Sequence, residues 1–243
     1  MKRACASLRF FLCVLAAGFF LPPIAAQNRP PVCEEIAKAY GFSSFGQVEQ
    51  IRYTFNVDLG EKKISRSWVW EPKTDRVWYE AKDKDGKPVK YEYLRSQMGS
   101  QPVNVSKEID PAFINDHYWL LFPFHLMWDK VAAMEDKGMA KMPVGKGTAR
   151  RVVVTYAKEG GYTPGDMYEL FVGQDNLIRA WIYHAGAAPK PSLIARWTAY
   201  KKAGPLVFST DHPGTREGGK PIRIFFTDVA VKLSGSGAWV AAH

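Results

Sequence analysis

Long stretches in which apolar and polar residues alternate, with turns and not helices between them, constrain this chain most. In IRYTFNVD (51–58), Ile51, Tyr53, Phe55 and Val57 alternate with polar residues. That period of two is typical of a strand with one buried face. Turn residues separate it from three further candidate strands, RSWVWE (66–71), RVWYEA (76–81) and VKYEYL (89–94). The sequence therefore predicts an antiparallel meander.

The same kind of segment returns in the second half of the chain. Six more strands are expected, at ARRVVVTYA (149–157), DMYELFV (166–172), LIRAWIYH (177–184), SLIARWTAY (192–200), PLVFS (205–209) and KPIRIFFTDVAVKL (220–233). Strands and helices do not alternate as a parallel nucleotide-binding sheet requires. We therefore predict a mainly β fold with some α (α+β), built on one antiparallel sheet of about ten strands that curls, with helices covering its concave side.

Two helical segments are expected. CEEIAKAYG (33–41) has an apolar face that includes Cys33, and Gly41 is a natural stop for the helix. Cys33 is interpreted as a buried small apolar residue. A helical insertion at roughly 108–130 begins with Asp110 as a candidate N-cap, and Pro123 ends or bends that helix.

The start of the chain is typical of a secretory signal. Three basic residues precede the apolar run 10–21, which is shorter than the roughly 20 residues that span a bilayer. Two prolines and a small-residue site then lead to Gln27. We expect residues 1–26 to be a cleaved signal peptide, residues 27–243 to form one domain with a flexible tail at roughly 234–243, and the protein to be periplasmic or secreted.

The basic charge does not point to nucleic acid. The formal net charge is +9, of which the signal segment supplies three charges. Basic and acidic residues are interleaved, as in KDKDGK (82–87), which is typical of a solvated face. No nucleic-acid partner is expected, and attraction to an anionic membrane surface is the milder functional interpretation.

Histidines and aspartates of the insertion are the candidates for chemistry. His117 and His125 are separated by Pro123, and no metal-binding motif surrounds them, so no metal and no cofactor are expected. His125 and Asp129 have helical i, i+4 spacing and are expected to hydrogen-bond locally. Asp116 beside His117 resembles half of an acid–base pair, but no nucleophile motif accompanies it.

Tryptophan is the most informative residue type, with eight in the chain. Indole is large and apolar with one donor, so it suits the wall of an apolar cavity, although an ordinary aromatic core is an equally good reading. On alternation and aromaticity we predict a cavity lined by Trp68, Trp70, Trp78, Tyr118, Trp119, Phe122, Trp128, Trp181, Tyr183 and Trp197. His117, His125 and Asp129 are expected as hydrogen-bonded polar groups near its mouth.

Three stretches resemble a known superfamily: RSWVWEPKTDRVWYE (66–80), FINDHYWLLFPFHLMWDK (113–130) and GYTPGDMYELFVGQDNLIRAWIYH (161–184). They are similar to the LolA/LolB-like half-barrel superfamily, whose members include periplasmic carriers of outer-membrane lipoproteins, and more closely to an uncharacterised family of exported bacterial proteins. The resemblance implies a curved sheet of ten or eleven strands, with helices as a lid over an apolar pocket for acyl chains. No ligand residue is carried over from that superfamily.

Three functions stay open at this point. The favoured one is an exported, non-enzymatic binding or carrier protein for a lipid, a lipidated protein or another hydrophobic ligand. It is expected to act as a monomer, with a membrane surface or a lipoprotein as a further candidate partner. The second is a periplasmic hydrolase that uses Asp116, His117 and His125. The third is a structural or protein-interaction module whose barrel is filled.

Overall fold

A single antiparallel sheet dominates the computed structural model, which describes residues 29–131, 133–159 and 163–243. The predicted signal segment lies outside the described residues. The strands are β1 (Val48–Asp58), β2 (Lys63–Glu71), β3 (Arg76–Lys82), β4 (Pro88–Leu94), β5 (Ala133–Lys141), β6 (Thr148–Thr155), β7 (Met167–Val172), β8 (Ile178–His184), β9 (Leu193–Arg196), β10 (Thr198–Ala203), β11 (Leu206–Arg216), β12 (Pro221–Leu233) and β13 (Trp239–Ala241).

Helices are few and mostly short. They are α1 (Pro31–Ala39), α2 (Asp110–Trp128), a π-helical turn η3 (Val105–Ile109), and the 3₁₀ segments η1 (Phe42–Gln47), η2 (Arg95–Ser100), η4 (Ala185–Ala187) and η5 (Glu217–Gly219). No helix among the described residues combines the length and apolarity needed to cross a membrane.

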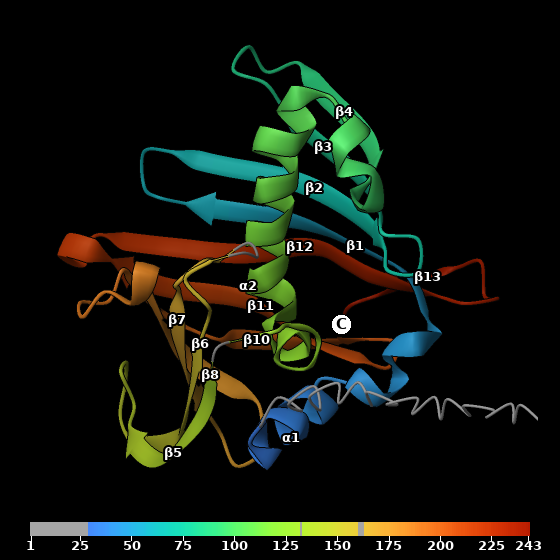
Figure 1. The fold of residues 1–243 in the computed structure, drawn as a ribbon. Helices are drawn as coiled ribbons and strands as arrows, with labels where there is room; N and C mark the ends of the chain where they lie inside the picture. Colours follow the sequence, from blue (N-terminus) through green and yellow to red (C-terminus); the bar gives the residue numbers. More distant parts are fainter. Residues whose placement is uncertain (1–28, 132, 160–162) are drawn as a thin grey trace, which may run out of the picture.

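The strands follow the order β4-β3-β2-β1-β12-β11-β9-β8-β7-β6-β5, with β10 beside β11 and β13 beside β12. The meander β1–β4 is thus joined to the rest of the sheet by the pairing of β1 with β12, although these strands are far apart in the sequence. The sheet is not closed, and it curves around α2, which runs across its concave side (Figure 1). The predicted mainly β, half-barrel architecture is confirmed.

The thirteen strands exceed the predicted ten or eleven for local reasons. SLIARWTAY divides at Trp197 into β9 and β10, which leave that residue between them. The segment after the insertion forms β5, and part of the expected tail forms β13. The end of the expected flexible tail at 234–243 is thus joined to the sheet: β13 pairs with β12, and the backbones of Lys202 and His243 exchange hydrogen bonds of 3.0 and 3.1 Å.

Helix α1 matches its prediction. It buries Cys33 and Ile36 completely, and the helix ends at Ala39, two residues before Gly41. Gly41 has φ +95°, and a Cβ there would lie 2.2 Å from the Pro205 carbonyl oxygen. Only glycine fits this turn, because the conformation is left-handed and the neighbouring backbone is too close for any side chain.

Helix α2 lies in the hollow of the sheet and buries most of its residues, which suits its apolar sequence. Pro111 and Asn115, near its start, are exposed. Pro123 does not end it: the backbone departs from helical geometry at Leu121 (φ −115°, ψ 15°), and the helix continues to Trp128. Arg29 holds its end, donating hydrogen bonds to the carbonyls of Leu126 (3.0 Å), Met127 (3.2 Å) and Asp129 (3.2 Å).

The expected N-cap of this helix is wrong. Asp110 itself has helical φ and ψ, and the cap position, Ile109, offers no side-chain hydrogen bond. The Asp110 carboxylate instead accepts hydrogen bonds from Arg95 Nε (2.9 Å) and the Tyr93 hydroxyl (3.2 Å). These partners come from β4 and η2, so the carboxylate ties the helix to the meander.

Candidate functional site

An apolar cavity of about 510 Å³ lies between the first half of α2 and the concave face of the sheet. It is lined by Phe55, Val57, Leu59, Ile64, Arg66, Pro111, Ile114, Asn115, Tyr118, Trp119, Thr163, Asp166, Tyr168, Trp181, Tyr183, Leu193, Arg216, Ile222 and Ile224. We call this the concave cavity. Its volume falls within the roughly 300–1,000 Å³ that is usual for small-molecule sites.

Strand register explains the aliphatic wall of the concave cavity. Val57 in β1 pairs with Ile64 in β2 on one side and with Ile224 in β12 on the other. Paired residues share a face of the sheet, so the three side chains form one continuous apolar row. Ile222 lies two residues from Ile224 and extends that row.

Helix α2 supplies the opposite wall through one face. Pro111, Ile114, Asn115 and Tyr118 follow helical i, i+3, i+4 and i+7 spacing, and all four line the concave cavity. Trp119 reaches the same space and packs on Trp181, with ring centroids 4.3 Å apart. The cavity is thus what remains where these side chains do not fill the space between helix and sheet.

A buried ion pair borders the concave cavity. Arg66 Nε and Nη2 donate to the two oxygens of Asp116, at 2.7 and 2.6 Å, and Trp68 Nε1 donates to the same carboxylate at 2.9 Å. Asp116 is fully buried. Burial raises the pKa of the Asp116 carboxyl, and the hydrogen bonds from Arg66, Asn115 and Trp68 oppose that rise.

A second cavity, of about 320 Å³, lies along a neighbouring face of α2. It is lined by Phe45, Trp70, Pro72, Arg95, Phe113, Ile114, His117, Tyr118, His125, Trp128 and Asp129. We call this the histidine cavity. Tyr118 and Ile114 line both cavities, so the helix separates two spaces rather than covering a single one.

The histidine cavity contains a chain of hydrogen bonds. Asp129 Oδ1 is 2.9 Å from His125 Nδ1, and His125 Nε2 is 2.9 Å from His117 Nδ1. The hydroxyls of Tyr118 and Tyr156 both donate to Asp129 Oδ2. His117 Nε2 is buried and has no hydrogen-bond partner among the described residues. The expected local bond between His125 and Asp129 is confirmed.

The burial of these hydrogen-bonded side chains shifts the pKa values of His117 and Asp129. Burial, with the neighbouring His125, holds the pKa of His117 well below its ordinary value, so His117 is neutral. Burial acts to raise the pKa of Asp129, but the hydrogen bonds from His125, Tyr118 and Tyr156 outweigh it and leave that pKa lowered. In this hydrogen-bond chain, the charged Asp129 carboxylate orients His125, and His125 in turn orients the neutral His117.

The pairing of Asp116 with the two histidines, expected for a hydrolase, is wrong. Asp116 is bound by Arg66 on β2, and Asp129 takes the place beside His125. No hydroxyl or thiol joins His117 Nε2 among the described residues. Nor do these residues contain a cluster of three or more His, Cys, Asp or Glu side chains placed to hold a metal ion.

The predicted lining residues separate into four places. Tyr118, Trp119, Trp181 and Tyr183 line the concave cavity, whereas Trp70, Tyr118, Trp128 and the polar trio line the histidine cavity. Trp68, Phe122 and Trp197 are core residues that are almost completely buried. The placement of Trp78 in the lining is contradicted by the register: Trp78 pairs with Val69 and Glu92, on the sheet face opposite to Trp68.

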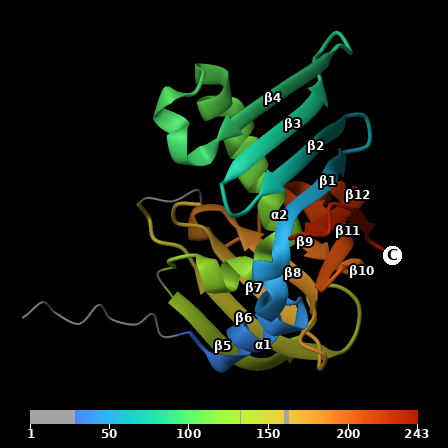
Figure 2. The same cartoon turned by 90° about the vertical axis from the view of Figure 1, so that its right-hand side faces the viewer.

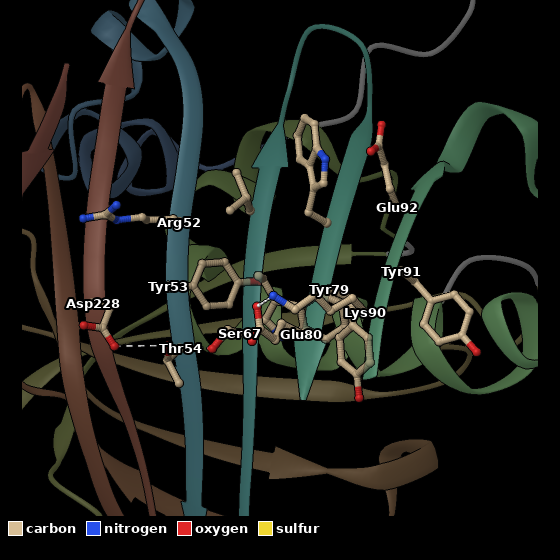
Figure 3. A pocket seen from close by; sticks show the side chains of 13 residues that line it. Arg52, Tyr53, Thr54, Ser67, Tyr79, Glu80, Lys90, Tyr91, Glu92 and Asp228 are labelled. Atoms are coloured by element: carbon tan, nitrogen blue, oxygen red, sulfur yellow. Dashed lines mark hydrogen bonds and ion pairs between the residues drawn. The ribbon is translucent and has the colours of Figure 1, made fainter. Parts of the chain in front are cut away.

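Trp78 belongs to a broad outer depression of about 790 Å³ over β1–β4. Figure 3 shows its side chains, among them Arg52, Thr54 and Asp228. Several of its polar groups pair with one another: Thr54 with Ser67 (2.9 Å) and Asp228 (3.2 Å), and Lys90 with Glu80 (2.9 Å). Arg52 Nε, by contrast, has no hydrogen-bond partner among the described residues. Although it is larger, this surface is lined by charged side chains, so the concave cavity is the better candidate for an apolar ligand.

Residues missed by the sequence reasoning are the aliphatic and charged members of the lining. Val57, Ile64, Ile222 and Ile224 follow the same alternation that identifies the strands, so that pattern could have found them. Arg66 and Arg216 carry no such signal, because a charged residue on an inward position looks like an irregularity in the pattern.

Comparison with known proteins gives structural likeness only. No protein-family model and no curated protein matches the chain. Among solved structures, it is similar to a DUF1329 family protein from Desulfovibrio piger, with 10% identity, a TM-score of 0.46, and coverage of 88% of this chain and 96% of that one.

Two further matches have the same character. A domain assigned to outer membrane lipoprotein sorting, from Vibrio parahaemolyticus, has 9% identity and a TM-score of 0.44, with coverage of 85% of this chain and 94% of that one. A LolA superfamily protein from Nitrosomonas europaea has 9% identity and a TM-score of 0.42, with coverage of 84% and 93%. These three matches are similarities of structure at 9–10% sequence identity.

Proposed function

We propose that the protein is an exported binding or carrier protein that holds the apolar chain of a lipid, a lipidated protein or a similar ligand in the concave cavity. The observation that carries this proposal is the 510 Å³ hollow with a continuous aliphatic wall from β1, β2 and β12. Each CH₂ group buried there contributes roughly 0.8 kcal/mol. An acyl chain therefore binds usefully even after the cost of ordering it.

Displacement of an apolar fluorescent dye tests the proposal. The wild-type protein is expected to bind the dye at one site and to release it to a long-chain alcohol. Ile64→Trp places a bulky ring in the aliphatic wall of the concave cavity and is expected to prevent dye binding. Val69→Trp is the matched control, because Val69 lies on the same strand but lines the outer depression.

Extraction with organic solvent, followed by mass spectrometry, gives an independent readout on protein purified from its own host. A co-purified lipid that Ile64→Trp lacks and Val69→Trp retains supports the carrier role. A protein that yields no lipid and binds no dye contradicts it.

A second candidate, a hydrolase, rests on the Asp129–His125–His117 chain beside the histidine cavity. Such a chain could orient a general base, but it would need a nucleophile or water at His117 Nε2. Assay against a panel of esters, with His117→Ala and His125→Ala, decides between the two: hydrolysis that disappears in both variants supports the enzyme, whereas no hydrolysis by the wild type rejects it.

The filled-barrel alternative, a structural or interaction module, has less support. Trp68 and Trp197 are almost completely buried in the core, as that alternative requires. Two separate cavities nevertheless remain along α2. A carrier needs an apolar space of this kind, whereas a structural module does not.

A further inference from the structure

Arg216 is an unusual residue in the lining of the concave cavity. It is the last residue of β11, where it pairs with Leu193, another lining residue. Its backbone N–H donates to the Lys220 carbonyl at 2.8 Å, which fixes the end of the strand. Its side chain, by contrast, has a buried Nε with no hydrogen-bond partner among the described residues. A buried donor without a partner costs free energy, so this position suits an acceptor that a ligand would bring.

The other charges of the concave cavity are already satisfied. Arg66 is held by both oxygens of Asp116. Asp166 accepts hydrogen bonds from the Tyr183 hydroxyl (3.0 Å) and the Gly186 N–H (2.8 Å), one on each oxygen. Arg216 therefore differs from both, since it lines the same space without a partner for its charge.

Arg216 also lacks an ion-pair partner in the described part of the chain. Among the described residues, no Asp or Glu oxygen forms an ion pair with it, whereas Arg66, Arg95, Arg150 and Arg223 each form at least one. The stretches that the structure does not describe, 1–28, 132 and 160–162, contain no acidic residue. Among the described residues, Arg216 thus has no ion-pair partner at this end of the concave cavity.

We infer that Arg216 binds the anionic head group, a carboxylate or phosphate, of an amphiphile whose apolar chain occupies the concave cavity. This inference rests on the proposed function, because it specifies the ligand of the same site. A guanidinium presents parallel N–H donors that match two oxygens of a carboxylate or phosphate. The aliphatic row Val57, Ile64 and Ile224 supplies the apolar part of the site, and Arg216 supplies its charged end.

Three ligands with the same alkyl chain test the inference: dodecanoate, dodecyl phosphate and dodecanol. They are titrated by calorimetry into the delipidated protein, at mildly alkaline pH and below their micelle concentrations. The wild type is expected to bind at least one of the two anions about tenfold more tightly than dodecanol, as a charge-assisted hydrogen bond implies. Which anion binds more tightly identifies the head group as carboxylate or phosphate.

Variants of Arg216 separate the head group from the chain. Arg216→Gln is expected to lose the preference for anions while keeping the affinity for dodecanol, and Arg216→Lys, which retains the charge, is expected to keep part of the preference. Arg223→Gln is the matched control, because Arg223 lies on β12, is mostly exposed and pairs with Asp211 at 2.8 Å outside the cavity. A thermal melt of each variant verifies that it folds.

The outcomes distinguish this inference from the proposed function. If dodecanol binds as tightly as both anions, or if Arg216→Gln keeps the anion preference, the role of Arg216 is overturned and the carrier function stands. If none of the three ligands binds the wild type, the carrier function fails and the inference fails with it.

Discussion

His212 lies in the aromatic core, and its burial there makes the stability of the fold depend on pH. It is fully buried against Trp119, Trp197 and Phe226, and its Nε2 donates to the Ser209 carbonyl at 3.2 Å. Burial lowers its pKa to about 3. The folded protein therefore keeps this imidazole neutral under conditions in which the unfolded chain takes up a proton.

The pKa of His212 is lower in the folded state than in the unfolded state, so acid destabilises the fold at this position. Above about pH 6.5, the ordinary pKa of histidine, both states are neutral at this position and stability is complete. As the pH falls from there to about 3, the unfolded state binds the additional proton, and stability decreases by up to about 1.4 kcal/mol per pH unit for this group. His117, whose pKa is also lowered, acts in the same direction.

Urea unfolding at a series of pH values measures this dependence. His212→Gln keeps an N–H donor but does not titrate, so its stability is expected to fall less steeply with acid than that of the wild type. Identical slopes for the two proteins would show that His212 is not the titrating group.

Cys33 offers a second test at a single side chain. It is fully buried in α1, and burial raises its pKa to about 11, so the reactive thiolate is scarce at neutral pH. In a chain that begins at Gln27, we expect the thiol to resist alkylation by iodoacetamide until urea unfolds the protein. Rapid modification of the folded protein, followed by mass spectrometry, would contradict the buried position.

The faces of individual tryptophans show what alternation can and cannot predict. Alternation correctly placed Trp68 and Trp70 on a common inward face of one strand. It could not relate Trp78 to them, because the side-chain face in the next strand depends on the register across the hairpin, and a shift of one residue exchanges the two faces. Val69, not Trp68, is the partner of Trp78.

The buried ion pair between α2 and β2 gives a prediction about how the helix is held. Asp116 is fully buried and Arg66 is about one-fifth exposed, so Asp116→Asn leaves a partly buried guanidinium without its counter-charge. The variant is expected to lose about 3 kcal/mol of stability, the lower end of what breaking a buried pair costs. Urea unfolding followed by far-ultraviolet circular dichroism measures the loss.

A surface pair provides the comparison for that variant. Arg76 and Glu92 join β3 and β4 with side chains 40% and 50% exposed, so Glu92→Gln is expected to change stability by less than about 0.5 kcal/mol. Equal effects of the two substitutions would mean that the Arg66–Asp116 pair does not anchor the helix.

The presence of helix α2 was predictable, but its ends were not. The sequence indicated a helix that starts near Asp110 and is ended or bent by Pro123, and the helix is found at 110–128. Asp110 failed as a cap because Arg95 and Tyr93, which no local pattern reveals, compete for its carboxylate. Pro123 follows the irregular backbone at Leu121 without ending the helix, whose last carbonyls accept hydrogen bonds from Arg29.

The arrangement of the entire sheet rests on one long-range pairing. Strand β1 pairs with β12, which brings the inward row of the first hairpin beside that of the last long strand (Figure 2). The sequence indicates the strands and their antiparallel character, but it contains no local signal for this neighbour relation. The hollow depends on it, because Val57 and Ile224 meet only through that pairing. Because long-range strand neighbours leave no local signal, the aromatic residues named from the sequence do not line one cavity. They are divided among two cavities, the core and the outer face.

The central claim is that the concave cavity binds an apolar chain, and calorimetric titration of the delipidated protein with dodecanol at several temperatures tests it most directly. Burial of apolar surface gives a negative heat-capacity change of binding. We predict saturable binding of one molecule with that signature in the wild type and in Val69→Trp, and its loss in Ile64→Trp. The absence of binding to the wild type, or equal binding to Ile64→Trp, would contradict the claim.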